Sequence, residues 1–202
     1  MKPIIALDVD GVLLDYHHAY AQAWAKAFGA VPAVRDPHAY WPIDRWEVRR
    51  LADDELAAFR TCFDHHFWSI IPAIAGAVEA CCDLAVAGYE LVCVSAIEAH
   101  FEAARLENLR NAGFPIERVI ATDNAGVNTS PKAAALRALR PVAFVDDFLP
   151  CLRGIPAEIH AALVLREPNG SPNAGDGLAW VHSQHADLTA FAAWWLNRQE
   201  RH

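Results

Sequence analysis

The segment IIALDVDGVLLD, residues 4–15, joins an apolar run directly to clustered carboxylates. Residues 4–7 read as the body of a buried strand, and Asp8, Asp10 and Asp15 follow it. Carboxylates placed this close repel one another, and burying them costs free energy unless partners offset their charge. A strand that ends in such a cluster predicts a site in which other groups, or a divalent cation, neutralise the carboxylates.

Four further apolar runs resemble the first one, which extends over residues 3–9. They cover residues 89–96, 118–122, 141–147 and 160–167. Continuous apolar runs are typical of strands that are covered on both faces, as in a parallel sheet. Helical patterns fall between the runs, at residues 76–88, 99–113 and 130–140, with a last one at 185–202. This alternation predicts an α/β fold with an open, doubly wound, Rossmann-like parallel sheet.

The third of these helical patterns carries signals for its start. Ser130 is expected to be its N-cap and Pro131 its first helical residue.

Residues 16–75 break the alternation, because they contain helical patterns and no good strand. We expect a small helical insertion after the first strand, with residues 1–15 and 76–202 forming the core domain. Asp15 is expected to have a structural role, either capping the helix that follows it or packing in the flap after the strand. The insertion is rich in aromatic residues: Trp24, Phe28, Tyr40, Trp41, Trp46, Phe63, Phe67 and Trp68.

Composition limits the classes of partner. The 202 residues carry a formal net charge of -8, which argues against a broad surface for nucleic acid polymers or anionic membranes. No apolar run reaches the roughly 18 residues of a membrane span. The five cysteines are odd in number and form no CxxC pair, so we expect reduced thiols and a cytoplasmic protein.

More polar residues stand where other predicted elements begin or end. Ser95 ends the second apolar run, Lys132 lies at the start of a helical pattern, and Asp146 and Asp147 end the fourth run. Ligands of open α/β sheets bind at the carboxyl ends of the strands, so these groups are expected to meet Asp8 and its neighbours. Carboxylate oxygens suit Mg²⁺, which also accepts phosphate oxygens, and an ammonium and a hydroxyl can bind the remaining phosphate oxygens.

These residues match a family pattern. The segment DVDGV, residues 8–12, resembles the first motif, DxDGx(T/V), of the haloacid dehalogenase superfamily. Ser95, Lys132 and the pair Asp146–Asp147 are similar to its second, third and fourth motifs, in the same order. The helical insertion stands where some members carry a cap that closes over the site. Residues 67–96 also resemble, more loosely, the corresponding stretch of deoxyribonucleotidases.

The resemblance implies a role for each motif residue. Asp8 would be the nucleophile that forms an aspartyl-phosphate, and Asp10 would protonate the leaving alcohol and then activate water. Mg²⁺ would be held by Asp8, the backbone carbonyl of Asp10 and Asp147, with Asp146 supporting through water. Ser95 and Lys132 would bind the phosphoryl group.

The activity that the resemblance implies is a Mg²⁺-dependent phosphatase, a hydrolase acting on a small phosphate monoester, with a nucleotide monophosphate as the first candidate. Members that dehalogenate lack an acid at the position of Asp10. A phosphotransferase or mutase that shares the aspartyl-phosphate, and a non-catalytic module that binds a phosphorylated ligand, are the alternatives. Trp41 and Trp46 are the insertion's candidates for substrate contact, and His17 and His18 lie near its expected hinge.

Overall fold

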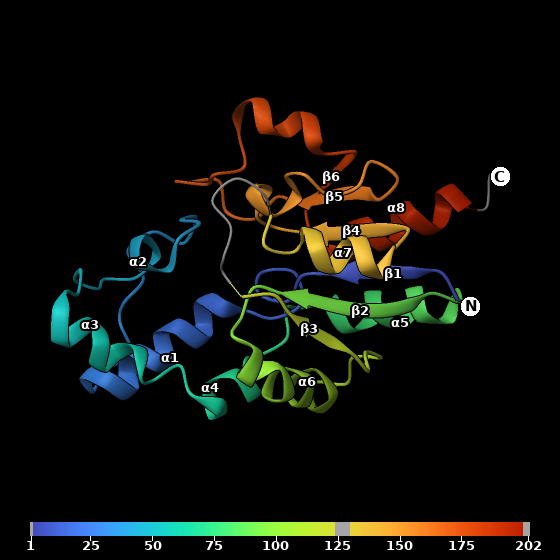
Figure 1. The fold of residues 1–202 in the computed structure, drawn as a ribbon. Coiled ribbons are helices and arrows are strands. Elements are labelled where there is room, and N and C mark those ends of the chain that lie inside the picture. Colours follow the sequence, from blue (N-terminus) through green and yellow to red (C-terminus); the bar gives the residue numbers. More distant parts are fainter. Residues whose placement is uncertain (1, 124–129, 200–202) are drawn as a thin grey trace.

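The computed structural model describes residues 2–123 and 130–199 of the chain. Within this part, a six-stranded sheet has the strand order β3-β2-β1-β4-β5-β6, and all neighbouring strands are parallel. The strands are β1 (Ile4–Leu7), β2 (Glu90–Ser95), β3 (Val119–Ala121), β4 (Ala143–Asp146), β5 (His160–Val164) and β6 (Ser183–His185). Figure 1 shows helices on both faces of the sheet. The predicted doubly wound α/β fold is confirmed.

The first five strands lie within their predicted ranges. The sixth, β6, was not predicted, because its sequence SQH contains no apolar run and only His185 is buried. It extends the sheet beyond β5, where it pairs Val164 with His185. Tertiary pairing, rather than local hydrophobicity, therefore defines this edge of the sheet.

The two faces of the sheet pack against different helices. Ile5 and Leu7 belong to a buried cluster that includes residues of α5 (Ala77–Val86) and α8 (Leu188–Gln199). Ala6, which points to the opposite face, shares a second cluster with Leu136 of α7 (Ala133–Leu139). Both clusters exclude water from the strands, which explains why the central residues of the strands are apolar on both faces.

The register of the central strands decides where the polar residues lie. Leu7 of β1 pairs with Cys93 of β2 and with Val145 of β4. The N–H of Asp8 then donates to the carbonyl of Val145 at 2.8 Å. Because the three strands run parallel in this register, the residues that follow them meet at one edge of the sheet.

A helical segment connects β1 to α5. It contains α1 (Tyr16–Phe28), α2 (Pro42–Arg45), α3 (Asp53–Arg60) and α4 (His65–Ser69) and no strand of the sheet. Figure 1 shows α1, α2 and α3 beyond the carboxyl ends of the strands. Asp15 caps α1 as expected, since its carboxylate accepts the N–H of His18 at 3.0 Å. Most aromatic side chains of this helical segment contact one another or the buried core.

The two ends of this segment lie side by side. The N–H of Asp15 donates to the carbonyl of Pro72, and the N–H of Ile74 donates to that of Leu13, both at 2.8 Å. Leu14 and Ala73 form an antiparallel bridge between these contacts. The chain thus leaves and re-enters the sheet region at one place.

The helix after β3 begins later than the sequence predicts. Ser130 was the expected N-cap, but α7 starts at Ala133 and Lys132 occupies the N-cap position. The hydroxyl of Ser130 instead accepts the N–H of Lys132 at 3.1 Å, which forms a tight turn ahead of the helix. The turn leaves Lys132 at the junction between loop and helix.

The remaining elements are α6 (Glu102–Asn111) and the 3-10 helices η1 (Ala99–Phe101), η2 (Leu149–Leu152) and η3 (Gly175–Trp180). In the part of the chain that the structure describes, every helix is too short or too polar to cross a membrane.

Candidate active site

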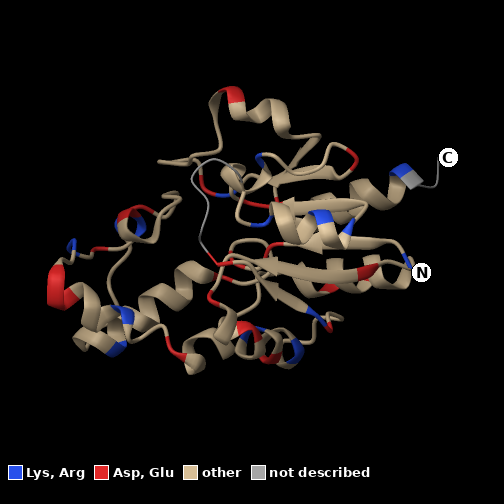
Figure 2. Cartoon of the chain, in the orientation of Figure 1, with Lys and Arg blue, Asp and Glu red and all other residues tan. Residues whose placement is uncertain are grey.

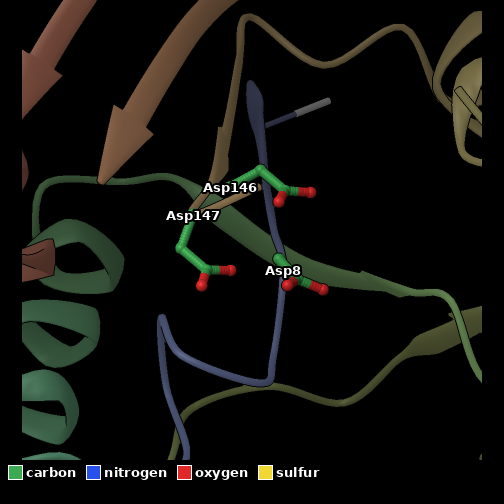
Figure 3. A group of neighbouring side chains, drawn as sticks. All are labelled: Asp8, Asp146 and Asp147. Carbon is green, nitrogen blue, oxygen red and sulfur yellow. The ribbon is translucent and has the colours of Figure 1, made fainter. Parts of the chain in front are cut away.

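Three carboxylates converge where β1 and β4 end. Asp8 follows β1, Asp146 is the last residue of β4, and Asp147 comes next. One oxygen from each can be chosen so that all three lie within 4.8 Å of one another. All three residues are buried, with exposed fractions of 7%, 0% and 3%. Figure 3 shows their side chains grouped at the ends of the two strands, and Figure 2 shows acidic segments along this edge of the sheet.

Lys132 connects two of these carboxylates. Its Nζ donates to Oδ1 of Asp8 at 2.6 Å and to Oδ2 of Asp146 at 2.7 Å. Burial disfavours the charged ammonium, but the charges of Asp146 and Asp8 outweigh this effect and hold the pKa of Lys132 well above its ordinary value. The ammonium therefore stays charged and fixes the relative positions of the two carboxylates.

Asp147 has different partners. Nε of Arg166 lies 2.7 Å from its Oδ2, and the hydroxyl of Tyr40 donates to the same oxygen at 3.3 Å. Asn173 donates to its backbone carbonyl at 2.7 Å. Gly11 passes close by, because a Cβ there would lie 2.5 Å from Oδ2 of Asp147, and its φ of +87° favours glycine. The glycine of the DxDG segment is thus required by a close approach.

The basic side chains nearby do not fully compensate the charge of the buried carboxylates. Burial raises the pKa of Asp146 to about 8 and that of Asp147 to about 7, despite the nearby charges of Lys132 and Arg166. A raised carboxyl pKa means that the ionised form is disfavoured by its surroundings. A divalent cation at this place would relieve the ionised carboxylates.

The oxygen atoms that remain free fit a hard cation. Both oxygens of Asp146 are engaged, since Oδ2 contacts Lys132 and Oδ1 accepts the N–H of Phe148 at 2.8 Å. Oδ2 of Asp8 and Oδ1 of Asp147 accept no hydrogen bond from the described residues. Within the same part of the chain, no hydrogen bond reaches the carbonyl of Asp10. These three oxygens could hold Mg²⁺, whose preferred ligands are oxygens.

The side chain of Asp10 is not part of the three-carboxylate group and has a partner of its own. Nη2 of Arg105 contacts both of its carboxylate oxygens, at 2.9 and 2.8 Å. Burial raises the pKa of Asp10, while the charge of Arg105 opposes that shift. Arg105 lies on α6 and is fully buried.

A cavity of about 470 Å³ opens above these groups. All six residues predicted from the motifs line it: Asp8, Asp10, Ser95, Lys132, Asp146 and Asp147. Ser95, the last residue of β2, is buried and belongs to the cavity lining. The other walls are mainly aromatic or apolar, formed by Tyr16, Tyr20, Tyr40, Trp41, Pro42, Ile43 and Phe148. The fold thus brings all six predicted residues to one cavity, and their individual roles stay predictions.

The two tryptophans predicted to contact substrate lie differently. Trp41 borders the cavity and is 40% exposed. Trp46 is outside the cavity lining, and its indole N–H donates to the carbonyl of His17 at 3.1 Å. His17 borders the cavity and contacts the carbonyl of Tyr40 through Nε2 at 2.9 Å, whereas His18 is absent from the lining.

Two basic residues of the site were missed in the sequence. Arg166 follows β5, so a polar residue at the end of an apolar run was a signal for it. Arg105 occupies a buried position of α6, where it interrupts a face shared with Ala104 and Leu109. An arginine on such a face signals a buried acidic partner, because isolated buried charge is unfavourable.

Comparison with known proteins finds similar folds among solved structures. No protein-family model matches the sequence, and no curated protein matches it. Solved structures do match. A haloacid dehalogenase family hydrolase from Deinococcus radiodurans R1, with bound phosphate and sodium, is 18% identical with a TM-score of 0.64, over 97% of this chain and 96% of that one.

Two further structures give the same picture. A protein described as a predicted phosphoglycolate phosphatase from Haemophilus somnus 129pt is 14% identical with a TM-score of 0.62, over 96% of this chain and 98% of that one. An L-2-haloacid dehalogenase is 17% identical with a TM-score of 0.61, over 96% and 100%. The chain has the fold of the haloacid dehalogenase-like hydrolases, so the resemblance that the motifs indicated is confirmed at the level of the fold.

Proposed function

We propose that this chain is a Mg²⁺-dependent phosphatase of the haloacid dehalogenase type, which hydrolyses a small phosphate monoester through an aspartyl-phosphate. One observation carries the proposal: the residues of all four motifs line one cavity, where the carboxylate of Asp8 accepts a hydrogen bond from Lys132. The similar fold of a hydrolase that holds phosphate supports the same chemistry.

Asp8 would be the nucleophile. One oxygen of its carboxylate would attack phosphorus as the bond to the leaving oxygen breaks, which forms the aspartyl-phosphate, while the other oxygen would contact the cation. Lys132, which donates to Oδ1, holds this carboxylate in place. Ser95 and Lys132 would bind the oxygens of the transferring phosphoryl group. Mg²⁺, held by Asp8, Asp147 and the carbonyl of Asp10, would supply positive charge to those oxygens.

Asp10 distinguishes a phosphatase from a dehalogenase. A leaving alcohol needs a proton, whereas a leaving halide does not. Asp10 lines the cavity and can deliver that proton, then take one from the water that hydrolyses the aspartyl-phosphate. This residue is our reason for preferring phosphoryl chemistry although one similar fold belongs to a dehalogenase.

The charge at the site favours an anionic substrate once metal is bound. Four carboxylates (Asp8, Asp10, Asp146 and Asp147) face three basic side chains (Lys132, Arg105 and Arg166), which leaves one negative charge in excess. A divalent cation reverses that sign and attracts a phosphate dianion.

The walls of the cavity suggest the leaving group. Tyr20, Tyr40 and Trp41 offer flat apolar surfaces, and the basic groups lie near the carboxylates. Such walls suit a planar ring, so a nucleotide monophosphate is the first candidate.

We also infer that residues 16–75 act as a cap over a core of residues 1–15 and 76–202. The free state of all five cysteines supports a cytoplasmic location.

The test is phosphate release from a panel of nucleotide, sugar and aryl phosphates, with Mg²⁺ and with EDTA. We expect release that requires Mg²⁺ and falls to background in Asp8→Asn. Asp83→Asn, an exposed aspartate on α5, is the matched control and should keep full activity. Phosphate transfer to an added alcohol in place of water would indicate a phosphotransferase. A folded, Mg²⁺-binding protein without release or transfer would contradict the proposal.

A further inference from the structure

Arg105 is the one fully buried arginine among the described residues, and no motif contains it. It lies on α6, and its Nη2 contacts both carboxylate oxygens of Asp10, at 2.9 and 2.8 Å. The Asp10 side chain is 25% exposed, since it also borders the cavity. One face of this carboxylate is therefore held by Arg105 and the rest is open to a ligand.

Trp68 of α4 fixes Arg105 in turn. The guanidinium carbon lies 4.7 Å from the centre of the Trp68 ring, which gives a cation–π contact. The indole N–H of Trp68 donates to the carbonyl of Phe63 at 3.1 Å, and the rings of Tyr16 and Phe101 lie 6.3 and 5.7 Å from its ring. The indole is thus held from several sides, which restricts the movement of the guanidinium beside it.

This arrangement is costly for stability alone. Nε and Nη1 of Arg105 are buried and have no hydrogen-bond partner among the described residues. A buried donor without an acceptor destabilises the fold, and an apolar side chain at this position would avoid that cost. Such an unsatisfied group in a site calls for a functional explanation.

A fixed partner can keep the carboxylate of Asp10 from turning toward the other charges of the site. Asp8 stands two residues before it, and Lys132 and a bound cation would attract any carboxylate in reach. A carboxylate drawn to them could no longer reach the leaving oxygen. Arg105 offers Asp10 a competing positive charge on the α6 side of the cavity.

We propose that Arg105, braced by Trp68, is a positioning residue that fixes the carboxyl group of Asp10 where its protonated form can donate a proton to the leaving oxygen. The inference rests on the proposed function, because it assigns Arg105 a part in the same reaction. It is separate from the motif residues, since Arg105 acts through Asp10 and does not line the cavity.

Leaving-group dependence tests the role. Poor leaving groups, such as alkyl alcohols, need protonation, whereas the p-nitrophenolate of an aryl phosphate leaves without it. Arg105→Met should lower kcat/KM for an alkyl phosphate by about 10²-fold or more, in the range that general acids contribute. For p-nitrophenyl phosphate the loss should stay below about 10-fold. This parameter covers the steps up to departure of the leaving group, so slow hydrolysis of the aspartyl-phosphate does not mask the effect.

Several variants serve as controls. Arg110→Met removes an exposed arginine from the same helix and should leave both substrates unaffected. Arg105→Lys should restore part of the alkyl phosphatase activity, and Trp68→Leu should show a weaker form of the same leaving-group selectivity. Equal losses for the two substrates in Arg105→Met, or no loss for either, would overturn the inference.

Crystal structures of the wild type and of Arg105→Met provide a readout that needs no activity. We expect the Asp10 side chain to adopt another rotamer, or several, in the variant. An unmoved Asp10 would overturn the positioning role even if the alkyl phosphatase activity falls. A wild type that hydrolyses neither substrate would contradict the proposed function, a result distinct from either failure of the inference.

Discussion

Lys132 decides the charge balance at the scale of single residues. The residue is 1% exposed, and its ammonium donates to Asp8 and Asp146 at 2.6 and 2.7 Å. Removing one partner of a buried ion pair leaves an uncompensated charge and typically costs about 3–5 kcal/mol. Lys132→Met should lower the free energy of unfolding by about that amount in metal-free protein at neutral pH, measured by urea denaturation. Lys26→Met, which breaks an exposed ion pair with Asp64, should change it little.

The same variant should lose activity. Without the ammonium, phosphate oxygens and the nucleophile lose a positive partner, so kcat/KM should fall by about 10²–10³-fold. A near-normal rate in Lys132→Met would contradict its assignment to phosphate binding.

The pH dependence of stability follows from Asp146 and Asp147. Their pKa values are raised to about 8 and about 7 by burial, above the roughly 3.9 of an unfolded aspartate. The folded protein therefore binds more protons than the unfolded chain between about pH 4 and pH 8, and stability falls as the pH rises through this window. Thermal unfolding in EDTA should show a lower Tm at pH 8 than at pH 5.5. Asp147→Asn should flatten this trend, and a Tm that rises with pH would contradict it.

At the scale of elements, the turn after β1 is set by Gly11. Its φ is +87°, and a Cβ would lie 2.5 Å from Asp147 and 2.7 Å from Arg166. Gly29 has the same φ with no atom within 4 Å of a Cβ, so Gly29→Ala isolates the backbone strain, roughly 1–2 kcal/mol. Gly11→Ala should cost that strain and also displace Asp147. We expect activity to fall at least about 10-fold in Gly11→Ala and to stay unchanged in Gly29→Ala, assayed with the best phosphate monoester.

The elements also show what sequence patterns can predict. The central residues of the five predicted strands are apolar because helices cover both faces of the sheet, so each apolar run was a local signal for a strand. The strand β6 and the start of α7 were not predicted correctly, because pairing with β5 and the turn at Ser130 depend on distant or competing contacts. Arg105 and Arg166 were missed for a similar reason. The acidic partner of Arg105 is Asp10, 95 residues away, and that of Arg166 is Asp147, which follows a different strand.

At the scale of the whole molecule, ligand binding should couple to stability. The three carboxylates that could hold a cation lie at the ends of β1 and β4, so a cation bound there would connect the two central strands of the sheet. A ligand at 100 times its Kd stabilises the folded state by about 2.7 kcal/mol. Mg²⁺ with a phosphate mimic should therefore raise the Tm by several degrees. Asp147→Asn should lose this shift while Asp83→Asn keeps it, and an equal shift in both variants would place the metal elsewhere.

The adjacent ends of the helical segment have a consequence for how such a protein can diversify. Backbone hydrogen bonds of 2.8 Å join Asp15 to Pro72 and Ile74 to Leu13. The whole segment is therefore attached to the rest of the fold at a single junction. None of the residues in between belongs to a strand of the sheet, so a change of length within this segment adds no residue to any strand. The segment also supplies Tyr20, Trp41 and Ile43 to the walls of the cavity, so substitutions there would change the surface that meets a substrate while Asp8 and Asp146 keep their places at the strand ends.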